Sequence, residues 1–212
     1  MEMCRPPAGR RVTKSSITAS HTAAKPRAAV AISIMQMFST ASNGVSLANP
    51  LASVCPRRLS GDYAIYAIAD QTLWQAPGSS DNDLNGFVRV AIAPEQDRNS
   101  ITWYVDMGMT YKGLLPGRDN DTAGIGFAYA KLSNSVSNLA KADIALSGMS
   151  QPIPDYEAVV EVTYQAQVTQ WLAVQPFFQY IIHPGGNAAD PNNPASAIGN
   201  AAVFGLRTAV TF

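Results

Sequence analysis

Two carboxylates, Glu157 and Glu161, stand four residues apart in the segment "YEAVVEVTYQAQ". Paired carboxylates are the catalytic groups of glycosidases, which need them roughly 5–9.5 Å apart. On an extended strand these two side chains point the same way but lie roughly 13 Å apart, at about 3.3 Å per residue. The spacing therefore argues against glycoside hydrolysis and favours a polar face that solvates or binds without reacting.

No other motif predicts catalysis, and we expect a protein that is not an enzyme and uses no cofactor. The sequence has no GxSxG, HExxH or CxxC motif and no phosphate-cradling glycine loop. His21 and His183 lie far apart without Cys or His at ligand spacing, so we expect no metal site. Cys4 and Cys55 could form one disulfide, but nothing in their spacing favours it over two separate thiols.

The polar residues are carried by segments whose side chains alternate in polarity. In "ITWYVDMGMTY", residues 101–111, the odd positions are apolar and the even positions are mostly small or polar. Side chains of a strand point alternately to its two faces, so this segment has one apolar face and one polar face. The apolar face would meet a packed core in a soluble sheet, or lipid in an outer-membrane barrel.

From residue 59 to residue 212 the alternation recurs, with turn-rich segments between the repeats. We predict about seven antiparallel strands, close to the roughly 9–11 residues that tilted strands need to span a membrane. Short and long connections are mixed, as in a barrel with tight turns at one rim and longer loops at the other. A helix is indicated only at 136–146. The predicted strands are 62–73, 87–93, 101–114, 123–132, 156–168, 172–183 and 203–212.

Composition favours the membrane barrel over a soluble sandwich. Charged residues are 14% of the chain, against about 25% in typical soluble domains, yet no apolar run approaches the roughly 20 residues of a membrane helix. The net charge of zero gives no indication of nucleic-acid binding. Aromatic residues near strand ends suit a membrane interface: Trp74, Trp103, Tyr111, Tyr156, Trp171, Tyr180 and Phe212. We therefore predict an all-β, antiparallel outer-membrane β-barrel.

Residues 1–58 differ from the rest of the chain and are rich in Ala, Ser, Thr and basic residues. We expect a divergent, poorly ordered segment here, separate from a barrel domain at 59–212. Its apolar run at 28–38 follows Lys25 and Arg27 and precedes small residues, which is the layout of an export signal. Non-native sequence and one extra strand at 29–38 are the other interpretations.

Four stretches of the chain resemble the carbohydrate-selective porins of the OprB family, in the family's order. They are "SGDYAIYAIADQTLW", "YKGLLPGRDNDTAGIGFAYAKLS", "DYEAVVEVTYQAQVTQWLAVQPFFQYIIHPGG" and "AAVFGLRTAVTF". The resemblance covers about residues 59–212. It implies an outer-membrane barrel of about sixteen antiparallel strands, through which small sugars diffuse into the periplasm. It also implies that Phe212, which ends the closing strand, is recognised by the barrel assembly machinery.

The resemblance covers only the C-terminal part of the family, so we expect a truncated family member. About seven strands would not close such a barrel, because single-chain bacterial barrels have even strand counts of about 8 or more. Two unpaired edges are costly in lipid. Closure would then need an N-terminal strand at 29–38, self-association, or a separately encoded N-terminal half.

A sugar pore needs a lumen of hydrogen-bonding groups that replace sugar hydration weakly. Connections 94–100, 133–155 and 183–194 are expected outside the cell, and 116–121 is expected to be a periplasmic turn. The alternative function is a soluble sugar-binding β-sandwich with the apolar faces packed inward. The candidate lumen residues are Arg89, Tyr104, Asp106, Lys112, Glu157, Glu161, Gln165, Gln179 and Arg207.

Overall fold

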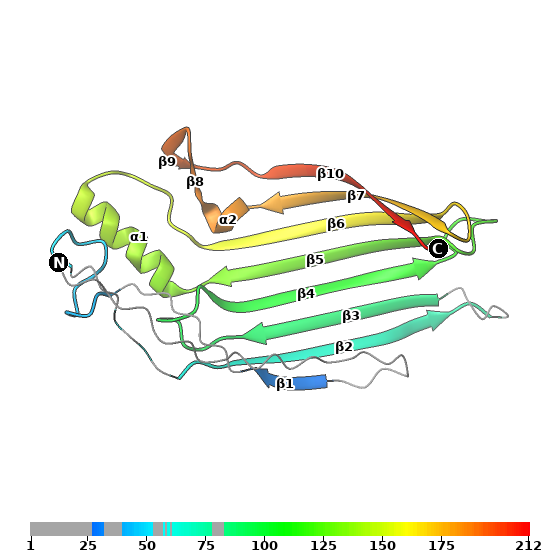
Figure 1. Ribbon diagram of the computed structural model, residues 1–212, viewed down its shortest axis with the longest axis horizontal. Helices are drawn as coiled ribbons and strands as arrows, with labels where there is room; N and C mark the ends of the chain where they lie inside the picture. The colour runs from blue at the N-terminus through cyan, green and yellow to red at the C-terminus, as the bar shows by residue number, and fades with distance from the viewer. Residues whose placement is uncertain (1–26, 32–39, 53–56, 58, 60, 78–82) are drawn as a thin grey trace.

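The chain folds into an antiparallel sheet of eight strands in the order β1-β2-β3-β4-β5-β6-β7-β10. The computed structural model describes residues 27–31, 40–52, 57, 59, 61–77 and 83–212. Figure 1 shows the strands side by side, with β1 to β7 in sequence order and β10 next to β7. The strands are β1 (Arg27–Ala31), β2 (Ala64–Gln75), β3 (Asp83–Ile92), β4 (Ile101–Lys112), β5 (Thr122–Leu132), β6 (Tyr156–Gln167), β7 (Leu172–Ile182) and β10 (Ala201–Val210).

All seven predicted strands are present, and most of their ends lie within two residues of the prediction. The main difference is β3, which begins at Asp83 instead of residue 87. Asn85 and Gly86 have the composition of a turn, yet they pair with Thr72 and Gln71 of β2. Pairing with a neighbouring strand outweighs local preference here, because strand propensity depends strongly on context.

The long connections contain two helices and a small hairpin. The helix α1 (Asn134–Ser147) includes the predicted helical segment. The one-turn α2 (Pro184–Asn187) and the hairpin of β8 (Ala189–Asp190) and β9 (Asn193–Ala197) are not indicated by the sequence pattern. Of the helices in the described part of the chain, none is long and apolar enough to cross a membrane.

The connections divide between two ends of the sheet, as predicted. The long connections with α1, α2 and β8–β9 lie at the left of Figure 1, and we call this the loop end. The short connections 113–121 and 168–171 and the C-terminus lie at the right, and we call this the turn end. This division matches a barrel with tight turns at one rim and longer loops at the other.

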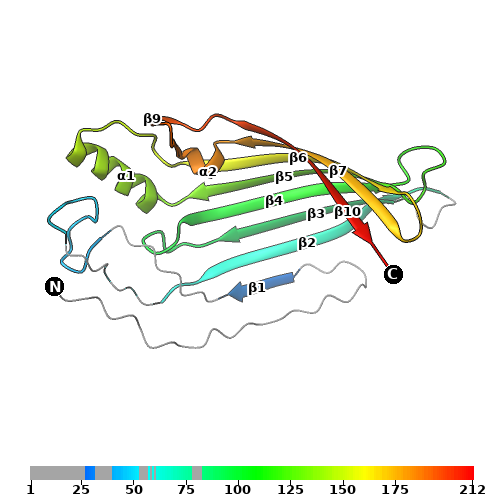
Figure 2. The ribbon, with the colours of Figure 1, turned by 45° about the horizontal axis from the view of Figure 1, so that its top comes forward.

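The N-terminal segment contributes the strand β1, whose five residues pair with Ile68 through Ala64 of β2. This agrees with one of the three interpretations of the segment, although residues 32–39 lie outside the described part. The rest of the proposed export signal and both cysteines lie outside it as well. Figure 2 shows β1 and β10 at opposite edges of the sheet. In the described residues these two edge strands do not pair with each other, so the sheet is an open part of a barrel.

The sheet has almost no packed apolar core. Ala41 and Ala158 are the buried hydrophobic residues of the described part, while several of its most buried side chains are polar, including Asp121 and Ser133. Large apolar side chains are exposed instead, and Phe204 is 79% accessible. A soluble sandwich buries its apolar faces between two sheets, and no second large sheet covers this one in the described residues.

Candidate pore-lining face

Strand pairing places all nine candidate lumen residues on one face of the sheet. Residues directly opposite each other in antiparallel strands share a face, and the pairs link the candidates in a continuous series. Arg89 pairs with Asp106 across β3 and β4, and Glu161 pairs with Gln179 across β6 and β7. We call this side the polar face. Its members among the candidates are Arg89, Tyr104, Asp106, Lys112, Glu157, Glu161, Gln165, Gln179 and Arg207.

Arg89 and Asp106 form the best-defined charged contact of the polar face. The Arg89 Nε donates to Asp106 Oδ1 at 2.8 Å, and a terminal guanidinium nitrogen donates to Oδ2 at 2.5 Å. This two-point geometry fits the planar fork of arginine to a carboxylate. The Asp106 side chain is 10% exposed and the Arg89 side chain is 48% exposed. Arg89 therefore keeps surface open for other hydrogen-bond acceptors.

A second polar group lies across β6, β7 and β10. Gln179 donates from its side-chain nitrogen to the Glu161 carboxylate. Gln175 donates to the Thr163 hydroxyl at 2.9 Å, and Arg207 approaches the Gln175 amide oxygen at 3.5 Å. Gln175 and Thr163 are absent from the candidate residues, although the alternation along their strands already placed both on the polar face.

Glu157 has a different role from the other candidates. Its Oε2 accepts a hydrogen bond of 2.6 Å from the backbone N–H of Gly185, in α2 at the loop end. The carboxylate thus helps to fix the β7–β10 connection near the sheet. Lys112 and Gln165 lie at the turn end, and both residues pair with Thr122 of β5, the strand between theirs.

The opposite face is apolar and is bordered by aromatic side chains at both ends. At the loop end, ring centroids lie 4.8 Å apart for Trp103 and Tyr129, and 5.1 Å apart for Tyr129 and Tyr156. At the turn end, Trp74 and Tyr111 stack at 6.1 Å. Trp103 and Tyr111 are eight residues apart on β4, about 26 Å along the strand. This is close to the roughly 25 Å height of the apolar band on outer-membrane barrels.

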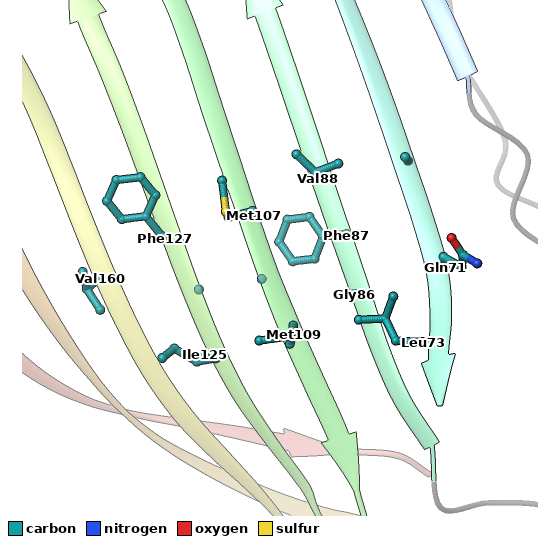
Figure 3. Close-up of a pocket in the computed structure, with 13 residues that line it drawn as sticks. Gln71, Leu73, Gly86, Phe87, Val88, Met107, Met109, Ile125, Phe127 and Val160 are labelled. Atoms are coloured by element: carbon teal, nitrogen blue, oxygen red, sulfur yellow. The ribbon is translucent and has the colours of Figure 1, made fainter. Parts of the chain in front are cut away.

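A hollow of about 490 Å³ lies on this apolar face, not on the polar one. Figure 3 shows side chains from β2 to β6 around it. Met107, Met109, Ile125, Phe127 and Val160 line it with other apolar residues, and Gln71 is its main polar side chain. It offers few groups for binding a hydroxylated ligand, so it is not the functional site.

The turn end is fixed by the buried carboxylate of Asp121, which is 2% exposed. Oδ2 accepts hydrogen bonds from Tyr164 at 2.6 Å and from Arg118 at 2.7 Å, and Oδ1 accepts one from the Gln167 N–H at 2.9 Å. Burial is the largest influence and opposes ionisation. The three hydrogen bonds together outweigh burial and hold the pKa of Asp121 below its ordinary value of 3.8.

The loop end is held by contacts between different connections. Asn99 donates to the Asp62 carboxylate at 2.7 Å, which joins the β3–β4 connection to the residues before β2. Lys131 forms an ion pair with Asp155, whose backbone N–H donates to the Gly186 carbonyl at 2.9 Å. These contacts join the connections to one another at the loop end of the sheet.

One polar face, one apolar face and two aromatic borders define the wall of an outer-membrane β-barrel. A family model described as "Carbohydrate-selective porin, OprB family" matches residues 22–212. The chain therefore belongs to the OprB family of carbohydrate-selective porins, and its location is the bacterial outer membrane. The match begins well before residue 59, where the resemblance of individual motifs begins.

Two relatives agree with this assignment. Porin B of Pseudomonas aeruginosa is 27% identical over 154 residues, which are 69% of this chain and 32% of that protein. A solved structure of Pseudomonas putida OprB at high pH is similar with a TM-score of 0.72 and 25% identity. That similarity covers 89% of this chain and 44% of the other. The chain thus spans about a third of the curated relative and under half of the solved one.

Proposed function

We propose that this chain forms part of the wall of a pore through which small carbohydrates diffuse into the periplasm. The observation that carries the proposal is the single polar face, on which nine predicted lumen residues from five strands lie together. Transport of this kind requires no reaction, and we propose no catalytic role for any of these residues. It requires groups that replace sugar hydration and release the sugar again.

The charges on the polar face favour an uncharged solute. Three of the nine residues are basic and three are acidic, and Asp70 of β2 adds one more carboxylate to the same face, so the face carries little net charge at neutral pH. Arg89 and Asp106 neutralise each other directly. A lumen with a strong field of one sign would select ions of the opposite sign. A balanced set of ion pairs and amides offers many hydrogen bonds without such a field.

Three further partners follow from this proposal. The apolar face would contact outer-membrane lipid. Phe212, which is fully exposed beyond the end of β10, would be recognised by the barrel assembly machinery. The unpaired edges of the sheet would be closed by further strands of a family barrel or by a second copy of the chain, because unpaired backbone groups in lipid cost several kcal/mol each.

Cell fractionation tests this proposal against a soluble sugar-binding β-sandwich. We expect residues 1–212, expressed with a suitable export signal, to partition into outer-membrane fractions. We also expect the folded chain to migrate differently on gels before and after heating, as folded barrel sheets resist detergent. Recovery of the chain as a soluble periplasmic protein, without detergent, would contradict the proposal.

A further inference from the structure

The polar face carries two phenylalanines at the middle of their strands, although such a face is otherwise rich in hydrogen-bonding groups. Phe177 is the central residue of β7 and Phe87 is near the centre of β3. Pairing with Thr163 and Gly205 places Phe177 on the polar face, and pairing with Asp70 and Gly108 does the same for Phe87. Phe87 also borders the hollow described above, whereas Phe177 is not among the residues that line it.

Each ring lies over a glycine of the adjacent strand. A Cβ placed on Gly205 would be 2.1 Å from Phe177 Cζ and 2.4 and 2.7 Å from the two flanking ring carbons. If the ring met Gly205 edge-on, with its tip, this Cβ would lie in the ring plane and much farther from the two flanking carbons than from Cζ. The Phe177 ring therefore presents one of its flat faces to Gly205, and its other face is turned away from the sheet.

The same arrangement recurs at Phe87, where a Cβ on Gly108 would be 2.7 Å from the ring. Any side chain larger than glycine would push either ring off the sheet. Two separate strand pairs thus combine a mid-strand phenylalanine with an opposing glycine. Phe87 remains 38% exposed, and Phe177 is half-buried.

Hydrogen-bonding groups surround the Phe177 ring. Gln175 and Gln179 lie two residues away on the same strand and face. Gln179 bonds to the Glu161 carboxylate, and the Arg207 guanidinium lies within 3.5 Å of the Gln175 amide oxygen. A flat apolar surface framed by amides, a carboxylate and a guanidinium matches a pyranose, which has C–H groups on its ring faces and hydroxyls around its edge.

We propose that Phe177 is a stacking platform for a pyranose ring halfway along the pore, with Gln175, Gln179 and Arg207 positioned to bond its hydroxyls. This inference rests on the proposed function and names a binding position within it. Gly205 is a positioning residue, because its lack of a side chain lets the ring lie flat.

Glucose binding by the full 212-residue chain, refolded in detergent, tests the platform. Saturation-transfer NMR reports which sugar protons contact the protein, and sorbitol is a control ligand with similar hydroxyls but no pyranose ring. The Phe177→Leu variant removes the flat ring but keeps an apolar side chain. The Phe178→Leu variant is its matched control, because Phe178 is adjacent on β7 but belongs to the apolar face, where it packs against Phe204.

We expect Phe177→Leu to weaken glucose binding roughly three- to tenfold, the range for loss of an aromatic contact, and to reduce saturation of the pyranose C–H protons. Phe178→Leu should leave glucose binding unchanged, and sorbitol binding should be unchanged in both variants. Glucose binding that is unchanged in Phe177→Leu, or reduced equally in Phe178→Leu, would overturn the platform while the proposed function stands. Absence of glucose binding by the folded native chain would overturn the platform, whereas the proposed function is tested separately by fractionation and by recording from the completed barrel.

A second variant tests the geometry with the ring retained. Gly205→Ala should displace the Phe177 ring and weaken glucose binding to a similar degree. Added to Phe177→Leu, it should cause no further loss, because coupled residues are not additive. Additive losses would show that the two residues act independently and would overturn the positioning role of Gly205. Circular dichroism confirms that each variant retains its β-sheet before binding is compared.

Discussion

At the scale of single residues, adjacent positions of β6 face different surroundings, lipid on one side and the lumen on the other. Val160 and Val162 are on the apolar face, and Glu161 between them bonds to Gln179 on the polar face. An arginine on the lipid side costs roughly 2–4 kcal/mol near the membrane midplane, whereas a lumen charge remains hydrated. We therefore expect Val160→Arg or Val162→Arg to impair membrane assembly far more than Glu161→Arg. An outer-membrane insertion assay measures this, and equal defects would disprove the assignment of faces.

Neutralising Arg89 or Asp106 should shift the ion preference of the pore in opposite directions. In a barrel completed with a family N-terminal half, Arg89→Gln should shift ion preference toward cations, because the Asp106 carboxylate loses its partner. Asp106→Asn should shift the preference toward anions for the converse reason. Reversal potentials across a salt gradient measure both shifts. Shifts in the same direction, or none in either variant, would argue that this pair does not face the pore.

The alternation of polar and apolar residues was sufficient to place these side chains, since a two-residue period fixes the face of every strand residue. It could not show that Glu157 is engaged by the N–H of Gly185, because that contact joins residues 28 positions apart. Nor could it single out Phe177, whose role depends on the glycine opposite it in β10. The face on which a side chain lies is a local property of its strand, whereas its contact partners depend on the register between strands.

At the scale of elements, the turn between β4 and β5 depends on one ionised carboxylate. The pKa of Asp121 is lowered in the folded chain, so its ionised form contributes stability above the ordinary value of 3.8. That contribution is lost as the pH falls through the lowered pKa. We expect the native chain to lose resistance to denaturant below about pH 4, and Asp121→Asn to be less stable at neutral pH and to lose part of this acid dependence.

Unfolding in detergent, followed by circular dichroism across this pH range, measures the effect. Asp119→Asn, in the same turn, is the matched control and should behave like the native chain. If Asp121→Asn retained the full acid dependence, other carboxylates would be responsible for it.

The strands were the most predictable elements, because each has a long alternating pattern and ends at turn-forming residues. The start of β3 was missed because Asn85 and Gly86 look like turn residues until β2 is present to pair with them. The hairpin β8–β9 and the turn α2 were missed because their short segments, rich in Gly, Pro and Asn, show no period.

At the scale of the whole molecule, the sheet is open along two edges. Its eight strands alternate in direction, so β1 and β10 run antiparallel to each other, as closing strands of a barrel must. The prediction of a barrel wall was available from composition and alternation. The place of β1 was not settled by the sequence, since "RAAVA" is short and pairs with residues 33 to 41 positions later.

Single-channel recording in a planar bilayer tests most directly whether this sheet is one part of a sugar pore. Residues 1–212 would be compared alone and together with a complete family N-terminal half. We predict currents that sugar inhibits from the completed barrel and none from residues 1–212 alone, because open strand edges are not stable in lipid. Comparable sugar-inhibited currents from residues 1–212 alone would contradict the need for a second half. Currents from the completed barrel that sugar leaves unchanged would contradict the sugar pore itself.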